Sequence, residues 1–211
     1  MTERPILFSG PMVRAILDGR KTQTRRVVNL KHVHDIDDTG TPMIQVNGLW
    51  RNALCPCGQA GDRLWVREAF QPLWSKDAVA CGNADYETGH GYNVLYPASE
   101  APVEWYDMRN ERLTTACKPS IHMPRWACRI LLEITGVRVE RLQEISDDDA
   151  EAEGIERRWT CLNPGTGSYA HANDVHDDFR SLWDSLATPG FTWAENPWVW
   201  VVEFKRLEGQ S

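Results

Sequence analysis

Long apolar runs are absent from this sequence. No stretch of about 18 apolar residues occurs, so we expect no transmembrane helix and no membrane partner. The N-terminus also lacks the basic-then-apolar pattern of a signal peptide, which favours a cytoplasmic protein. No internal repeat or low-complexity tract is present, which argues against repeat architectures.

Positive charge is also scarce. The chain has 23 Lys and Arg against 30 Asp and Glu, for a formal net charge of −7. Because nucleic acid is attracted by a positive field, this excess of acid argues against a protein that coats long stretches of it. A local basic cleft or a nucleoside-sized ligand remains compatible with the composition.

Metal-binding cysteine patterns are sparse. Cys55 and Cys57 are the only close pair among six cysteines, and the second pair that a tetrahedral zinc site usually has is missing. His32 and His34 could complete such a site only through the tertiary fold. Without a signal peptide the thiols are expected to stay reduced. We therefore interpret Cys55 and Cys57 as thiols in a turn, and expect no metal and no cofactor.

What the sequence does have is a mixed pattern of strands and helices. Alternating or continuous apolar residues predict strands over residues 5–8, 63–70, 128–139 and 198–207. Helical spacing and end signals predict helices over residues 11–18, 147–153 and 173–187. The last strand is nearly continuous in apolar residues, which is typical of a central strand.

The 211 residues suit one elaborated domain. Helices do not alternate regularly with strands, which favours a mixed α+β barrel over a doubly wound parallel sheet. Three stretches rich in turn residues predict loop insertions, at about 31–60, 71–117 and 157–173. We expect short strands as well as loops in the second of these.

The most charged segment, from Gly19 to Arg26, follows the first predicted helix at once. Gly19 can end that helix in a left-handed conformation, so the basic side chains start from a fixed point. A basic run after a helix is often a solvated cap that favours the helix dipole. The pattern alone leaves a cap and a binding cleft as alternatives.

The segment from Ile16 to Arg26 resembles the signature of the ASCH family, G-x-K-x-x-[E/T]-x-R. Three further pieces resemble the family in the expected order: Gly61–Val66, Asp147–Gly154 and Val199–Leu207. Much of the intervening sequence is similar to the insertions of longer, phage-type members. The resemblance implies an α+β fold built on a PUA-like mixed β-barrel with flanking helices.

The resemblance also implies a reaction. Some small bacterial members are amidohydrolases that remove the acetyl group of N4-acetylcytidine, a linear amide. On the matching positions, Lys21 is the base, Thr24 the nucleophile and Glu153 the proton donor. Glu151 is the near competitor of Glu153, because helix spacing directs the two side chains differently.

The residue types fit this chemistry. An amide resists attack unless the nucleophile is activated and the leaving nitrogen is protonated. The charges of Arg20, Arg25 and Arg26 would lower the pKa of a buried lysine and thereby favour its role as a base. Arg26 could also bind phosphate or an oxyanion.

Other substrate contacts are predicted outside this segment. Trp65 and Trp126 could stack on a base, although such residues more often pack in a core. His122 could act on phosphate or in proton transfer, although a lone loop histidine more often does neither.

Two alternatives to the amidohydrolase stay open. One is a non-catalytic RNA- or nucleotide-binding module in which Lys21, Arg25 and Arg26 hold phosphate. The other is a ribonuclease, which the absence of paired histidines beside the lysine disfavours. In each case the expected partner is a nucleoside or single-stranded RNA.

Overall fold

The computed structural model describes residues 1–28, 35–36, 42–46, 49–74, 84–85, 90–101, 104–107, 112–163 and 168–208. The chain forms two compact units. The first unit comprises residues 1–4, 15–64 and 132–206, and the second comprises residues 5–14, 65–131 and 207–211. The single domain with three insertions therefore stays a prediction.

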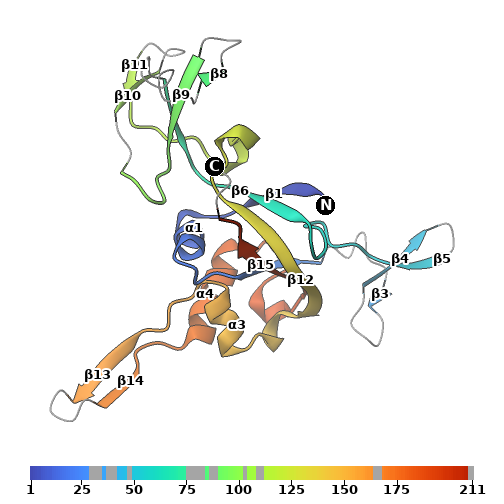
Figure 1. Cartoon of the computed structure of the whole chain (residues 1–211). Helices are drawn as coiled ribbons and strands as arrows, with labels where there is room; N and C mark the ends of the chain where they lie inside the picture. The colour runs from blue at the N-terminus through green and yellow to red at the C-terminus, as the bar shows by residue number, and fades with distance from the viewer. Residues whose placement is uncertain are drawn as a thin grey trace. The chain divides into compact units, whose positions relative to one another are not determined.

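A five-stranded sheet contains the four predicted strands and one more. Its order is β1 (Glu3–Leu7), β6 (Arg63–Arg67), β12 (Leu131–Arg141), β15 (Trp198–Arg206) and β2 (Gln23–Val27). Both β12 and β2 pair with β15 in antiparallel register (Figure 1). β15 has a neighbour on each side and buries four successive residues from Val199 to Val202, which confirms the predicted central position.

The fold class is α+β, as predicted, but the sheet does not close into the predicted barrel. Closure requires the two edge strands to pair with each other. Among the described residues, the edges are β1 and β2, and neither has a second strand neighbour. Helix α1 lies between the two edge strands in sequence, so β1 and β2 do not form a hairpin, and the sheet stays open.

The helices follow the predicted end signals. Helix α1 (Gly10–Leu17) ends before Gly19, whose φ of 75° is the left-handed conformation expected there. Helix α3 (Asp147–Ala152) is capped by Ser146, whose hydroxyl accepts from the backbone N–H of Asp149. Helix α4 (Val175–Leu186) begins at Asp174, whose carboxylate accepts from two backbone N–H groups.

The core of the first unit packs α3 and α4 against β15, and Figure 1 shows the two helices side by side. Two 3-10 turns, η3 (Leu142–Glu144) and η4 (Trp193–Glu195), add to it. Its fully buried members are Leu142, Ile145, Ala150, Val175, Phe179, Trp193, Val199 and Val201. This apolar layer fixes the elements that carry the charged residues described below.

Two small sheets extend the first unit. One contains β3 (Asp35–Ile36), β4 (Pro42–Val46) and β5 (Leu49–Asn52), within a stretch that we predicted to be irregular. The other is the hairpin of β13 (Trp159–Asn163) and β14 (Ser168–His171), where we predicted a loop. Such short strands were not predicted because turn residues surround them, and an alternation of apolar and polar residues cannot be recognised over four or five residues.

The second unit contains the short strands expected between residues 71 and 117. β7 (Gln71–Trp74), β9 (His90–Leu95) and β8 (Ala84–Asp85) form one sheet, and β10 (Trp105–Asp107) pairs with β11 (Arg112–Thr114). Two 3-10 turns follow, η1 (Ser120–His122) and η2 (Arg125–Ala127). No helix in the described part of the chain is long and apolar enough to span a membrane.

Candidate active site

The charged segment that follows α1 is a strand, which the sequence pattern did not predict. Side chains alternate across a strand, so Gln23 and Arg25 of β2 share one face while Thr24 and Arg26 share the other. Polar residues in an edge strand usually face water. Here Gln23, Thr24 and Arg25 are all buried, so their polar groups require partners within the protein.

Lys21 lies just before β2 and its side chain is fully buried. Its Nζ donates to Glu153 Oε2 at 2.7 Å, to the backbone oxygen of Glu153 at 2.7 Å and to that of Gln23 at 2.9 Å. The Lys21 side chain is 0% exposed and that of Glu153 is 5% exposed. The predicted base and the predicted proton donor are therefore in direct contact, although they are far apart in sequence.

Burial is the largest influence on the pKa of Lys21. Desolvation lowers this pKa because a dry site disfavours the ammonium form. The carboxylate of Glu153 acts in the opposite direction, while the charges of Arg26 and Arg25 lower the pKa further. The net direction is downward, which is the direction that a lysine base needs.

Arg25 is a second buried cation that contacts the carboxylate of Glu153. Its Nη1 donates to Glu153 Oε1 at 3.3 Å, and its Nη2 donates to Asp149 Oδ2 at 3.1 Å. Its Nε and Nη2 both donate to Glu140 Oε1, the first at 3.1 Å. The guanidinium also lies 5.8 Å from the centre of the Phe179 ring. Arg25, predicted to bind substrate, thus holds protein carboxylates.

Strand register brings a third cation to this network. Val201 pairs with Arg25 on one side and with Arg138 on the other, so the three lie in one row across β2, β15 and β12. Arg138 donates to Glu140 Oε2 at 3.0 Å and to both carboxylate oxygens of Asp149, at 3.2 and 3.3 Å. It also donates to Glu203.

The sequence analysis did not propose site roles for Arg138, Glu140 and Asp149. Arg138 and Glu140 are two residues apart on β12, so their side chains share a face. Charged residues at alternating positions of a predicted strand were the signal that could have identified them. Asp149 lies in the first turn of α3, where an acidic residue usually serves only the helix end. The pKa of its carboxyl is lowered, because the Gln23 hydrogen bond and the Arg25 and Arg138 charges outweigh its burial.

Thr24, the predicted nucleophile, is buried on the other face of β2. Its Oγ1 accepts a hydrogen bond from Arg26 Nη1 at 2.7 Å, and Arg26 Nη1 also donates to the backbone oxygen of Arg25 at 2.9 Å. A guanidinium on the hydroxyl oxygen favours its deprotonated form. Thr24 and Lys21 therefore have different partners in the described contacts.

Gly154 brings the end of α3 close to Lys21. Its φ is +99°, and a Cβ built on it would lie 3.0 Å from the Ala15 Cβ and 3.3 Å from the Lys21 Cβ. Only glycine adopts this backbone readily and leaves the space that Lys21 occupies. The backbone oxygen of Gly154 also accepts from Arg20, whose exposed guanidinium pairs with Asp18.

The two candidate acids of α3 lie in different surroundings. Glu153 contacts Lys21 and Arg25, whereas Glu151 accepts from Arg157 Nε and is about two-fifths exposed. Helix geometry directs the two side chains to different sides, as expected. The geometry brings Glu153, and not Glu151, to Lys21.

The remaining predicted contacts belong to the second unit. Trp65 carries the guanidinium of Arg67 over its ring, at 5.5 Å from the ring centre. His122 and Trp126 are exposed on η1 and η2. Lys21, Thr24 and Glu153 belong to the first unit.

Cys55 and Cys57 occupy a turn, as predicted, and both are free thiols. The backbone N–H of Gly58 donates to the Cys55 oxygen at 3.0 Å. A hydrogen bond from the Cys55 thiol lowers the pKa of Cys57 to about 7, with help from the charges of Arg26 and Arg4 against the effect of burial. The same contact raises the pKa of Cys55.

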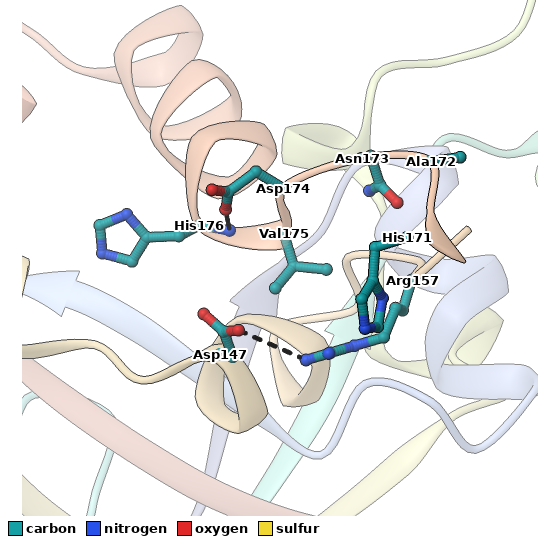
Figure 2. Close-up of a pocket in the computed structure, with 8 residues that line it drawn as sticks. All are labelled: Asp147, Arg157, His171, Ala172, Asn173, Asp174, Val175 and His176. Carbon is teal, nitrogen blue, oxygen red and sulfur yellow. Dashed lines mark hydrogen bonds and ion pairs between the residues drawn. The ribbon is translucent and has the colours of Figure 1, made fainter. Parts of the chain in front are cut away.

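A second location to consider is a pocket of about 700 Å³ at the start of α4 (Figure 2). It is lined by Asp147, Arg157, His171, Ala172, Asn173, Asp174, Val175 and His176. Asp147 pairs with Arg157 at 3.6 Å, and Asp174 accepts from the His176 backbone N–H at 2.9 Å. In Figure 2 the His176 ring points away from His171 and Arg157. These groups serve the fold, so the Lys21 cluster is the stronger candidate.

Across the described residues, no group of three or more His, Cys, Asp or Glu side chains is arranged to hold a metal ion.

Comparisons with known proteins add little to this geometry. No family model matches the sequence, and no curated protein matches it. A solved structure that it resembles is an ASCH domain from Lactobacillus crispatus JV V101, with 13% identity and a TM-score of 0.41 over 97% of this chain and 79% of that chain. A similarity at this level assigns neither fold nor function to this chain.

Proposed function

We propose that this chain is an ASCH-type amidohydrolase that removes the acyl group of N4-acetylcytidine or a similar acylated base. The observation that carries the proposal is the buried 2.7 Å contact between Lys21 Nζ and Glu153 Oε2. It joins two residues, 132 positions apart in the sequence, to which the resemblance to the ASCH family assigns the roles of base and acid. A solvated cap at the end of α1 would not require a distant carboxylate.

The contact suits acid–base catalysis because the Lys21–Glu153 pair has a charged and a neutral state, which differ only in which of the two residues carries the shared proton. In the charged state, Lys21 is an ammonium and Glu153 a carboxylate. Transfer of that proton along the hydrogen bond gives an amine and a carboxylic acid, which are the base and the acid that amide cleavage needs. Desolvation lowers the pKa of Lys21 and so favours its amine form, which is the form that a base requires.

Thr24 supplies the nucleophile in this proposal. For this step Lys21 Nζ and Thr24 Oγ1, which have different partners in the structure, must come within hydrogen-bond reach of each other. Thr24 Oγ1 then attacks the acyl carbon while Lys21 takes the hydroxyl proton, and the C–N bond breaks as Glu153 protonates the leaving nitrogen. Free cytidine leaves, and water hydrolyses the remaining Thr24 ester to release the carboxylic acid. Arg26, which donates to the Thr24 oxygen, stabilises negative charge on that oxygen during attack. Substrate entry requires the buried side chains to become accessible.

The test is hydrolysis of N4-acetylcytidine, followed by the change in ultraviolet absorbance and by chromatography of cytidine. We expect turnover by the intact chain and its loss in Lys21→Met, Thr24→Val and Glu153→Gln, each of which keeps the side-chain volume. Thr24→Ser should retain activity because it keeps the hydroxyl. Circular dichroism and thermal unfolding establish that each variant is folded. Undiminished turnover by folded Lys21→Met protein would refute the assignment.

A non-catalytic binding module is the second candidate, and one observation favours it. Lys21, Thr24 and Glu153 are all buried, and Lys21 and Glu153 are bound to each other, which is how a structural ion pair would look. The same assay separates the two functions. If the intact chain produces no cytidine but binds nucleosides or RNA, the cluster supports the fold and the binding surface lies elsewhere.

A further inference from the structure

We propose that Cys55 and Cys57 are a redox-active dithiol, which a small organic disulfide converts reversibly into an intramolecular disulfide bond. The two cysteines lie in one turn of the first unit, the Cys turn (residues 55–58). The inference goes beyond the proposed hydrolysis and does not depend on it, because neither thiol has a role in that reaction.

The Cys turn holds its two thiols close together. The backbone N–H of Gly58 donates to the Cys55 oxygen at 3.0 Å, so Pro56 and Cys57 occupy the centre of a β-turn. Proline suits the first central position because its fixed φ matches the turn. The chain reverses over these residues, which brings the Cα atoms of the two cysteines within the roughly 4.4–6.8 Å that disulfide bonds span. The Cys55 thiol donates to the sulfur of Cys57, so the two atoms that would bond are already in contact.

Contacts with the N-terminal residues hold the Cys turn in place. The Asp62 carboxylate accepts from the backbone N–H of Gln59 at 3.3 Å and from that of Thr2 at 2.7 Å. Gly58 has a φ of +124°, and a Cβ built on it would lie 2.6 Å from Arg4 Nη1. Only glycine leaves the space that this guanidinium occupies. The Cys turn is therefore anchored, and a cation lies directly against it.

The two thiols differ in access and in protonation. Cys57 is partly exposed, whereas Cys55 is buried. The hydrogen bond from Cys55 and the charges of Arg26 and Arg4 lower the pKa of Cys57 to about 7, against the effect of burial. The same hydrogen bond and burial raise the pKa of Cys55. Because the thiolate is the form that attacks a disulfide, Cys57 is the attacking thiol and Cys55 the resolving one.

The exchange takes place in two balanced steps. The Cys57 thiolate attacks one sulfur of the small disulfide, whose S–S bond breaks, and the first small thiolate leaves. Cys55 gives its proton to that thiolate, and its sulfur attacks Cys57 Sγ to release the second small thiolate, which takes a proton from solvent. The two cysteines are oxidised by two electrons, and the small disulfide is reduced to two thiols. An excess of small thiol reverses both steps.

The short spacing favours a redox role over a structural one. A disulfide stabilises a fold mainly by restraining the unfolded chain, and this effect grows with the length of the loop that it closes. One residue separates Cys55 from Cys57, so a bond between them restrains very little chain. A disulfide that adds little stability is the kind that can open and close without unfolding the protein.

The test is incubation of the intact chain at pH 7 with oxidised glutathione, followed by acid quenching, alkylation and mass spectrometry. Trypsin cleaves after Arg51 and Arg63, so one peptide, residues 52–63, contains both cysteines and no other. We expect this peptide to become two hydrogens lighter with no glutathione attached, and dithiothreitol to restore it. In Cys55→Ser the same peptide should keep glutathione on Cys57, because the resolving thiol is missing. In Cys57→Ser it should stay reduced over the same time.

Cys117 is the matched control within the same protein. It is a partly exposed free thiol like Cys57, but desolvation raises its pKa. At pH 7 glutathione should attach at least about 5-fold faster to Cys57, measured in Cys55→Ser, than to Cys117, because the larger thiolate fraction outweighs the lower nucleophilicity of that thiolate. Equal rates would overturn the proposal. So would a peptide 52–63 of the intact chain that stays reduced, or one that keeps glutathione on Cys57.

This result is separable from the proposed hydrolysis. Oxidation is measured without N4-acetylcytidine, so a chain that does not hydrolyse that substrate can still form the disulfide. Lys21→Met should form it at the rate of the intact chain, because this variant leaves the Cys turn and its two arginines unchanged. Circular dichroism establishes that the cysteine variants are folded, and the measurement on the intact chain does not depend on them.

Discussion

The two units differ in whether their charged side chains are buried or exposed. In the first unit, three cations and four carboxylates form one network around Glu153, and the side chains of Lys21 and Arg25 at its centre are almost wholly buried. In the second unit, Lys118, His122 and Arg125 are exposed on or just before the turns η1 and η2. A buried charge is expensive unless it is paired, whereas an exposed charge needs no partner.

This difference indicates where chemistry and recognition would lie. A dry, paired site fixes protonation states and strengthens local electrostatics, as acid–base chemistry requires. An exposed cationic surface interacts with a polyanion at a strength that salt controls. Substitutions should therefore change the free energy of unfolding in the first region and the affinity for polyanions in the second.

The largest effect is expected from breaking the buried network. Glu153→Ala leaves Lys21 and Arg25 without their shared carboxylate, and removal of one partner of a buried pair typically costs about 3–5 kcal/mol of the free energy of unfolding. Urea unfolding followed by circular dichroism measures the loss. Glu203→Ala is the matched control, since Glu203 pairs with Arg138 but is 46% exposed, and it should cost at most about 1 kcal/mol.

The pH dependence of Cys57 alkylation tests the effect of the charges at the edge of the same region. Its pKa is lowered from 9.0 to about 7 by the Cys55 thiol and by two nearby arginines. The thiolate fraction, and with it the rate of alkylation by iodoacetamide, should therefore rise through about pH 7 rather than pH 9. Mass spectrometry of the labelled peptides gives the profile for each cysteine.

Cys55→Ser and Cys117 serve as internal comparisons for that profile. Cys55→Ser weakens the hydrogen bond that is the main cause of the shift, so the Cys57 profile should move toward higher pH. Cys117 has a raised pKa because of desolvation, and its labelling should need more alkaline conditions. Identical profiles for Cys57 and Cys117 would contradict this account.

Gly154→Ala should have a smaller effect than Glu153→Ala. The positive φ of Gly154 and the close Ala15 and Lys21 Cβ atoms both oppose a side chain, for a loss of about 1–3 kcal/mol. Gly61→Ala separates the two causes, because Gly61 also has a positive φ but has open space where a Cβ would lie. Equal losses in thermal unfolding would show that contact with Lys21 contributes nothing.

The parts of this fold that sequence patterns predicted are those with local causes. Ser146 and Gly19 mark helix ends through their own backbone chemistry, and the apolar run after Trp198 marks a central strand. Strand β2 was missed because its polar residues become buried only when β12 and α3 supply carboxylates from over a hundred residues away. The resemblance identified Glu153 by motif. The alternation of Arg138 and Glu140 along β12 was a local signal that they share a face, but their contacts with Arg25 and Asp149 depend on the tertiary fold.

The smallest stability effect is expected from substitutions of the exposed residues of η2, which contrast with the buried network of the first unit. Arg125→Ser and Trp126→Ser alter exposed side chains above a core that Met123 and Ala127 complete, so unfolding should change by no more than about 0.5 kcal/mol. Thermal and urea unfolding test this directly. A change within that range would show that exposed charge in the second unit contributes little to the free energy of unfolding, in contrast to the buried charges around Glu153. Destabilisation of more than about 1 kcal/mol would instead mean that these side chains belong to the packing of their unit, as the Lys21 cluster does.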